Sequence, residues 1–324
     1  MAEAWRFFTT EVRAVRGLSP HFVRVTFTGE DLDRFADNGF DQRIKLILPL
    51  ADGGFEHLPT HADWYEEWRS LPDHRRNPVR TYTVRAVRPR QKEVDLDMVL
   101  HGATGPASRW AVEVSPGAPA RLMGPNADFD GVHGGIDFRP PALTANPQAF
   151  TPSRRTPDPR ALTLDPPDLA AAADTGSTPH LLIAGDETAV PAIASILGCL
   201  PPYARGESLI EIPSPDDIQD LTAPPGVPVT WLPRNGNPHG ERLITEVRRR
   251  FGKSAKPTDI EDVDVDTDTL WEVPEPVTGH FYAWLAGEAG VIKTLRRYLV
   301  GECGVDRGSV AFMGYWRLGR PEDI

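Results

Sequence analysis

The apolar pattern of this chain changes once along its length, and this change limits the folds that are open to it. Before residue 126, segments such as FVRVTFTGE (residues 22–30) alternate apolar with polar side chains, which is typical of half-buried antiparallel strands. From residue 180, apolar runs such as HLLIAG and HFYAWLAG alternate with segments of helical spacing. Such alternation indicates a parallel sheet covered by helices. The sequence therefore predicts two domains, an antiparallel β-barrel followed by an α/β domain with a doubly wound parallel sheet.

Two stretches of the chain show neither pattern. Residues 127–178 are rich in proline and partly of low complexity, and residues 253–278 are acidic and lack periodicity. Segments that cannot bury much apolar surface do not build a core of their own. We therefore expect a barrel domain over residues 1–126, an irregular insertion or linker over 127–178, and an α/β domain over 179–324.

Charge and composition narrow the possible functions. The formal net charge is −11, which argues against a nucleic-acid-binding protein, although arginines gather in DHRRNPVRTYTVRAVRPRQK. Local basic patches on an acidic chain suit an anionic small ligand, and a solvated charged surface is the alternative. The sequence has no run of about twenty apolar residues and no apolar signal-peptide core, so we expect a cytoplasmic protein without membrane insertion.

Metal ligation is not expected. Cys199 and Cys303 lie far apart and form no CxxC pair. His57 and His61 have the spacing of two helical ligands, but the proline between them disfavours a helix and no third ligand accompanies them. The sequence also shows no catalytic triad pattern, so we assign no catalytic acid or base.

The segment RTYTVR is a candidate cofactor-binding strand. On a strand, Arg80 and Tyr82 point to one side and Thr81 and Thr83 to the other. The arginine can hold a phosphate while the tyrosine ring stacks on a flat cofactor, and the Thr83 hydroxyl can bond to a ring nitrogen. An ordinary strand with exposed arginines explains the pattern equally well.

A candidate anion site follows the next strand in HGATGPASRWA. Gly105 permits a tight turn, and Pro106 suits the first position of a helix. The backbone N–H groups of Ala107 and Ser108 would then face an anion at the helix N-terminus. A capped helix that connects two barrel strands is the alternative.

The turn in HLLIAGDETAVPAIASIL has the wrong charge for a phosphate site. Gly185 ends an apolar strand, but Asp186 and Glu187 follow it directly. Asp186 and Thr188 can cap the next helix. We therefore expect this turn to contact rings and riboses rather than phosphates.

Five motifs in this order resemble the siderophore-interacting protein family. They are RTYTVR, VLHGATGPASRWA, LLIAGDETAVPAIASIL, YAWLAGEAGVIKTLRRYL and FMGYWRLGRPED. The family's members are flavin-dependent ferric-siderophore reductases of the ferredoxin-reductase superfamily. The resemblance covers most of the chain outside residues 127–178 and 253–278. It implies FAD held mainly by the barrel, and NADPH or NADH at the carboxyl ends of the α/β strands.

The resemblance also implies which residues contact FAD. Those in the barrel are Arg80, Thr81, Tyr82, Thr83, Val99, Leu100, His101, Gly105, Pro106, Ala107 and Ser108. Those in the α/β domain are Asp186, Thr188 and Trp316.

Further residues are assigned to the nucleotide and the siderophore. For NADPH or NADH they are Glu187, Arg234, Gly287 and Glu288. Arg234 follows a strand end, where its guanidinium can meet a 2′-phosphate, and a solvated loop residue is the alternative. Lys293 and Arg296, three apart on one helix, are expected to face the anionic ferric siderophore.

The resulting hypothesis is a reductase that passes electrons from NADPH or NADH through FAD to a ferric siderophore and releases Fe(II). A general NAD(P)H flavin reductase or diaphorase on the same fold is an alternative, as is a siderophore-binding protein without catalysis. Ferredoxin is an alternative electron donor.

Overall fold

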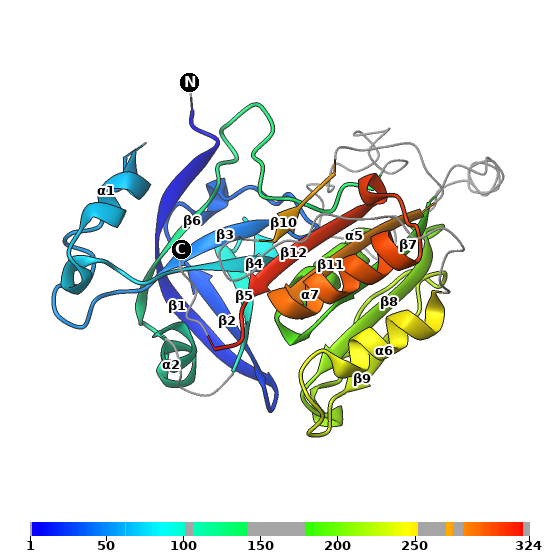
Figure 1. Ribbon diagram of the computed structural model, residues 1–324. Coiled ribbons are helices and arrows are strands. Elements are labelled where there is room, and N and C mark those ends of the chain that lie inside the picture. The colour runs from blue at the N-terminus through cyan, green and yellow to red at the C-terminus, as the bar shows by residue number, and fades with distance from the viewer. Residues whose placement is uncertain are drawn as a thin grey trace. The chain divides into compact units, whose positions relative to one another are not determined.

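The computed structural model describes residues 2–61, 63–100, 106–140, 179–251, 270–274 and 281–319 (Figure 1). The chain divides into two compact units, one built mainly from residues before 136, and the other from residue 136 onward together with residues 38–40. The domain boundaries expected at residues 126 and 178 stay a prediction. Residues 141–178 of the expected insertion lie outside the described residues.

The first unit contains a closed antiparallel barrel, which confirms the predicted architecture. The strand order around the barrel is β1-β2-β5-β4-β3-β6 (Figure 1). The strands are β1 (Trp5–Ser19), β2 (Phe22–Thr28), β3 (Arg43–Ile47), β4 (Val79–Arg88), β5 (Glu93–Val99) and β6 (Pro119–Pro125). Alternating side chains turn inward and form one buried cluster, to which five strands contribute Phe8, Phe27, Leu46, Leu96 and Leu122.

The helices of this unit lie in connections between strands. They are α1 (Trp64–Ser70), α2 (Pro106–Glu113) and the short 3₁₀ helices Leu32–Arg34 and Asp73–Arg75. The sequence predicted α2 from Gly105 and Pro106 at its start, but it did not predict α1. Trp64 and Trp68, four residues apart, bury one side of α1 against Ile47 and Val79.

The long first strand was also not apparent from periodicity. Register shifts between Val12 and Ala14, and between Gly17 and Ser19, interrupt its pairing with β2. Each shift changes which side chains face inward, so the period-two pattern does not continue along the strand.

The second unit contains a six-stranded, mostly parallel sheet, which confirms the predicted α/β fold. The order is β10-β12-β11-β7-β8-β9, and β10 alone runs antiparallel to its neighbour. The strands are β7 (His180–Gly185), β8 (Arg205–Ile212), β9 (Val229–Pro233), β10 (Trp271–Glu272), β11 (Phe281–Glu288) and β12 (Val310–Trp316). Strand β10 corrects the sequence interpretation, because it lies in a stretch where no periodic element was expected.

In the described part of this unit, three α-helices accompany the sheet. They are α5 (Val190–Cys199), α6 (Glu241–Arg250) and α7 (Ala289–Arg296), and a π-helical turn, Arg297–Glu302, continues α7. Short 3₁₀ helices occur at Glu187–Ala189, Pro215–Asp217 and Arg307–Ser309. Helices α6 and α7 lie on one face of the sheet (Figure 1). Their apolar side chains share one buried cluster with strands of the sheet.

The strand order of the sheet reverses between β7 and β11. From β7 the chain proceeds outward through β8 and β9, and it then returns to the other side of β7 to form β11 and β12. Right-handed crossovers in opposite directions place their helices on opposite faces of a sheet. Ligands of such sheets bind at the carboxyl ends of the strands, beside this reversal.

Candidate functional site

Polar and charged side chains gather at the carboxyl ends of the parallel strands in the second unit. Asp186 and Glu187 follow β7, Arg234 follows β9, and Trp316 ends β12. His239 joins them from the segment just before α6. All five belong to the same compact unit. The strand reversal therefore carries a candidate ligand site.

Asp186 is the most connected residue of this group. Its carboxylate accepts hydrogen bonds from the backbone N–H of Thr188 (2.9 Å), the backbone N–H of Glu288 (2.7 Å) and the indole N–H of Trp316 (2.9 Å). The side chain is almost fully buried, and this burial, with the charge of Glu187 beside it, raises the pKa of Asp186 to about 6. Asp186 caps the short helix after β7, as the sequence predicted.

Glu187 and Arg234 form a two-pronged ion pair. The Arg234 guanidinium donates to both carboxylate oxygens of Glu187, at 2.5 and 2.7 Å. Burial would raise the pKa of Glu187, but the contacts with His239 and Arg234 outweigh it and lower this pKa to about 2. Arg234 also lies 3.4 Å from an oxygen of Glu211, which is fully buried. Two carboxylates therefore surround the arginine that the sequence assigned to a 2′-phosphate.

His239 lies between the two acidic residues after β7. Its Nε2 is 3.4 Å from Glu187 Oε2 and 3.7 Å from Asp186 Oδ2, and its ring stands edge-on to Trp316 at 5.0 Å between centroids. Burial lowers the pKa of His239, but the contacts with Glu187 and Asp186 outweigh it, so the pKa is raised. The imidazole links the carboxylates to the indole in one buried network.

Two glycines and Glu288 shape the edge of this site. Gly287 has a φ of +150°, and a Cβ there would lie 2.6 Å from Asp186 Oδ2, so only glycine lets the carboxylate approach the backbone of β11. Glu288 caps α7 by accepting from the backbone N–H of Val291 at 2.9 Å. Gly240 before α6 has a φ of +82°. These features fix the positions of the strand ends.

The sequence found part of this group and missed part of it. It assigned Asp186, Glu187, Thr188, Arg234, Gly287, Glu288 and Trp316 to ligands, and the structure brings these seven to one sheet edge. It missed His239 and the buried Glu211. The two carboxylate oxygens of Glu211 accept hydrogen bonds from the backbone N–H groups of Gly240 and Leu243, at 2.6 and 2.9 Å. Both follow from the placement of α6, which local sequence does not reveal.

The predicted siderophore-binding pair is not an exposed pair. The Arg296 side chain is only 3% exposed and lies 3.0 Å from Glu272 of β10. This burial and ion pair correct the expectation that Arg296 faces a docking ligand. Lys293 is half-buried, and its contact with a siderophore stays a prediction.

The predicted flavin strand is β4, in the first unit. Tyr82 pairs with Ile44 and Arg80 with Leu46, both inward-facing residues of β3, whereas Thr81 lies opposite Lys45 and accepts a hydrogen bond from its Nζ at 2.8 Å. The side chains therefore alternate as expected. Arg80, Thr81 and Tyr82 are half-buried, and Thr83 is buried.

The predicted phosphate turn is described only in part. Val99 ends β5, and the backbone N–H of Leu100 donates to His21 O at 2.8 Å. His101 and Gly105 lie outside the described residues. Helix α2 begins at Pro106, so the N–H groups of Ala107 and Ser108 lie in its first turn.

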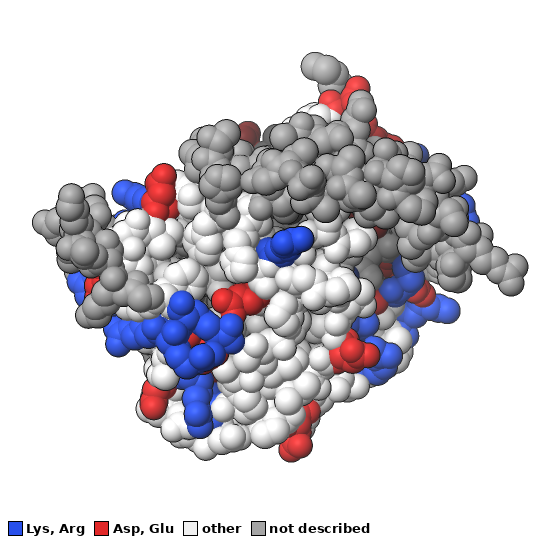
Figure 2. Space-filling model, turned by 90° about the vertical axis from the view of Figure 1, so that its right-hand side faces the viewer, with Lys and Arg blue, Asp and Glu red and all other residues white. Residues whose placement is uncertain are grey.

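The other arginines around β4 have internal partners. Arg88 forms a two-pronged ion pair with Asp95 at 2.6 and 2.7 Å, and Arg85 lies 3.6 Å from Asp97. The face seen from the right-hand side of Figure 1, which does not present β4, also has Lys and Arg side chains beside Asp and Glu side chains (Figure 2). Arg85 and Arg88 therefore pair with acidic residues of the neighbouring strand β5.

The described residues contain neither a cluster of metal ligands nor a helix that could cross a membrane. No three His, Cys, Asp or Glu side chains in those segments are grouped so that they could hold a metal ion. His61 instead contacts Glu67 at 2.6 Å. In the same part of the chain, no helix is long and apolar enough to cross a membrane.

Comparison with known proteins identifies the family. Residues 11–129 match the model of the siderophore-interacting FAD-binding domain, and residues 178–319 match that of the siderophore-interacting protein. An uncharacterized protein of Mycobacterium tuberculosis is 36% identical over 317 residues, which cover 97% of this chain and 91% of the relative. The chain belongs to the siderophore-interacting protein family.

Other members of the siderophore-interacting protein family match over nearly the whole chain. The ferric vibriobactin reductase ViuB of Vibrio cholerae is 27% identical, with 94% of this chain and 88% of ViuB covered. The crystal structure of the siderophore-interacting protein SipS from Aeromonas hydrophila has a TM-score of 0.62 and 26% identity, and the match covers 98% of this chain and 93% of SipS. The barrel and parallel sheet together form the fold of ferredoxin reductases.

Proposed function

We propose that this protein is an FAD-dependent reductase that transfers electrons from NADPH or NADH to ferric siderophores and releases Fe(II) inside the cell. The observation that carries the proposal is the order of the two family domains along the chain, first the FAD-binding domain and then the siderophore-interacting domain. A relative aligned over 88% of its own length, ViuB, is named a ferric vibriobactin reductase.

The donor set of the barrel fits FAD. An arginine, a tyrosine and two threonines lie in one run on β4, and Arg80, Thr81 and Tyr82 are half-buried rather than fully enclosed. Arg80 would hold phosphate oxygens, Tyr82 would stack on the flavin ring, and the N–H groups of Ala107 and Ser108 would donate to the pyrophosphate. When bound, FAD accepts two electrons from a nicotinamide and gives them singly to Fe(III).

The carboxyl edge of the parallel sheet would bind the nicotinamide nucleotide. Sheets with this strand reversal bind their ligands there. The acidic turn after β7 suits ribose hydroxyls and a ring amide, which can donate hydrogen bonds to carboxylates. Trp316, held by Asp186, would exclude water from one side of the ligand. No acid–base residue is needed, because the redox chemistry belongs to the cofactors.

Anaerobic reduction tests this function. The FAD-loaded protein is mixed with NADPH or NADH, flavin bleaching is followed, and a panel of ferric siderophores is then added with a ferrous-iron indicator. We expect bleaching by at least one nucleotide and indicator colour with ferric siderophores. Turnover no faster with ferric siderophores than with simple acceptors would instead make the protein a general flavin reductase. Absence of bound FAD would favour a siderophore-binding protein.

The Arg80→Ala variant tests the flavin strand. Loss of one charge-assisted hydrogen bond to phosphate, about 1.5–3 kcal/mol, should weaken FAD retention by about ten- to a hundredfold, measured by equilibrium dialysis. Arg90→Ala, in the exposed turn between β4 and β5, is the matched control and should retain FAD fully. Equal retention by both variants would refute the phosphate role of Arg80.

A further inference from the structure

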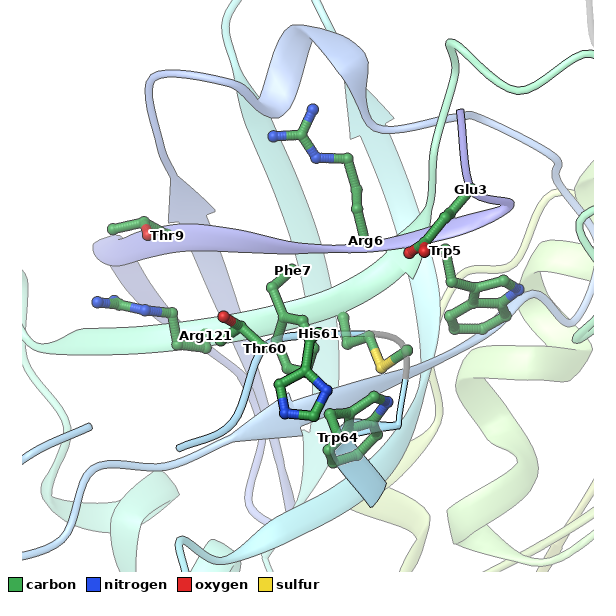
Figure 3. A pocket seen from close by; sticks show the side chains of 10 residues that line it. Glu3, Trp5, Arg6, Phe7, Thr9, Thr60, His61, Trp64 and Arg121 are labelled. Carbon is green, nitrogen blue, oxygen red and sulfur yellow. The ribbon is translucent and has the colours of Figure 1, made fainter. Parts of the chain in front are cut away.

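A pocket of about 360 Å³ lies on the first unit, beside strands β1 and β6 (Figure 3). Small-molecule sites begin at about this volume. Its lining residues are Glu3, Trp5, Arg6, Phe7, Thr9, Thr60, His61, Trp64, Arg121 and Met123. None of them belongs to β4 or α2, the elements to which the proposed function assigns FAD. The pocket is therefore separate from that assignment.

The floor of the pocket is the outer surface of the barrel. Phe8 and Leu122 turn into the barrel core, so their neighbours Phe7 and Arg121 face outward. Thr9 pairs directly with Arg121, and Phe7 with Met123. Arg121 and Thr9 therefore lie at one end of the floor, and Phe7 and Met123 lie nearer its middle.

Aromatic rings line the centre of the pocket. Phe7 and Trp64 meet edge to face, with 5.3 Å between ring centroids. Trp64 is buried and also contacts Tyr65 and Trp68, so its ring is held in place. Such walls favour a flat apolar group.

The cation at one end of the pocket has no acidic partner among the residues that the structure describes. The Arg121 guanidinium lies 4.4 Å from the centroid of the Phe55 ring, and its Nη1 donates to Ala120 O at 3.1 Å. No carboxylate of the described residues forms an ion pair with it. By contrast, Arg6 pairs with Asp31, and His61 pairs with Glu67.

This unpaired charge indicates what the pocket binds. A cation that is partly withdrawn from water without a counter-ion is costly, and a bound anion would offset that cost. The one acidic lining residue, Glu3, lies at the opposite end from Arg121 in Figure 3, so it leaves the guanidinium available. The pocket thus combines a cationic end with an aromatic centre.

We propose that this pocket is a binding site for a small aromatic carboxylate. The carboxylate would receive a forked pair of hydrogen bonds from Arg121, beside the hydroxyls of Thr9 and Thr60. The ring would lie against Phe7, Met123 and Trp64.

Calorimetric titration of the full-length, FAD-loaded protein tests this site. The probe is 2-naphthoate, and 2-naphthamide is a neutral molecule of nearly the same shape. We expect 2-naphthoate to bind at least about tenfold more tightly than the amide. Arg121→Gln should remove this difference, and Arg16→Gln, an exposed arginine of β1 outside the pocket, should preserve it.

The FAD content of each variant shows whether it is folded. If Arg121→Gln does not fold, Arg121→Lys takes its place, and it should bind 2-naphthoate more weakly than the native protein because it lacks the forked geometry. Absence of binding, equal binding of the two probes, or 2-naphthoate binding unchanged by substitution of Arg121 would each overturn the proposal.

Discussion

At the scale of single residues, the pairing of Arg234 changes what a guanidinium at a strand end can recognise. Glu187 accepts hydrogen bonds from both terminal nitrogens of its guanidinium, and an oxygen of the buried Glu211 lies 3.4 Å from Nη1. One positive charge thus faces two negative ones, with His239 adding a cation only when it is protonated. A 2′-phosphate entering this site would meet excess negative charge, whereas a 2′-hydroxyl would not. Within the proposed function, the pair therefore favours NADH.

The Glu187→Gln variant tests this effect on nucleotide choice. It removes one of the two negative charges beside Arg234 and leaves that of Glu211. We expect the ratio of kcat/KM for NADPH to that for NADH to rise at least about tenfold, mainly through KM for NADPH. Glu246→Gln, which removes an acidic partner of Arg249 and Arg250, is the control and should leave the ratio unchanged. An unchanged ratio in Glu187→Gln would show that the Glu187–Arg234 pair does not decide between NADPH and NADH.

The buried carboxylate of Asp186 should make stability depend on pH. Its pKa is raised to about 6 in the folded state by burial and by Glu187, from 3.8 in the unfolded chain. The folded state therefore binds this proton more tightly, and the contribution of Asp186 to stability falls as pH rises from about 4 to 6. Glu187, with a pKa lowered to about 2, has the opposite dependence, and its contribution is lost below pH 4.5.

Urea unfolding of Asp186→Asn at pH 5 and pH 7 checks this sign. The substitution removes the titration but also weakens the hydrogen bonds to Thr188, Glu288 and Trp316. We expect its cost in the free energy of unfolding to be about 1 kcal/mol smaller at pH 7 than at pH 5. A cost that is equal at both pH values, or larger at pH 7, would show that Asp186 does not titrate as described.

At the scale of elements, the sequence predicted the strands and helices whose apolar pattern is uninterrupted. Strands β2 and β7 and helix α6 have such patterns, and the structure contains all three. Strand β1 escaped detection because its register shifts break the alternation, and β10 because two residues cannot show a period. The periodicity of apolar residues shows that one face of an element is buried. It cannot reveal an element that is too short or too irregular to repeat the pattern.

The candidate site shows the same limit. Residues directly after strands, such as Asp186 and Arg234, could be assigned because strand ends are visible in the sequence. Their partners could not, since Glu211 and His239 reach them only through the packing of β8 and α6. The burial of Arg296 was missed for a related reason, because its partner Glu272 lies in the undetected β10.

The start of α6 permits a matched test of backbone geometry. Gly240 and Gly236 have similar φ values, +82° and +87°, so alanine is strained at both. A Cβ at Gly240 would lie 2.2 Å from Val291 Cγ2 of α7. A Cβ at Gly236 would have no atom of the described residues within 4 Å, apart from its chain neighbours. We expect Gly240→Ala to lose about 1–3 kcal/mol more unfolding free energy than Gly236→Ala, measured by urea denaturation. Equal losses would mean that α6 and α7 adjust without cost.

At the scale of the whole molecule, the compact units do not follow the order of the chain. Residues 38–40 lie between β2 and β3 in the sequence but belong to the second unit. The Phe40 ring stacks on Phe138 at 5.6 Å, and the Phe40 N–H donates to Cys199 Sγ at 3.4 Å. Phe138 in turn meets Tyr282 of β11 edge-on at 5.7 Å. The second unit thus depends on a segment from the first part of the chain.

Phe40→Ala should therefore loosen the second unit although residue 40 lies in the first part of the sequence. Loss of the stacked pair and its burial should cost about 1–3 kcal/mol. Hydrogen exchange followed by mass spectrometry should accelerate in α5 and β11 and stay unchanged in β2 and β5. Phe129→Ala, which removes a half-buried ring from the first unit, should leave α5 and β11 unaffected. Hydrogen exchange reports the stability of the unit that opens. If exchange in Phe40→Ala became faster only in the barrel strands, residues 38–40 would stabilise the first unit instead of the second.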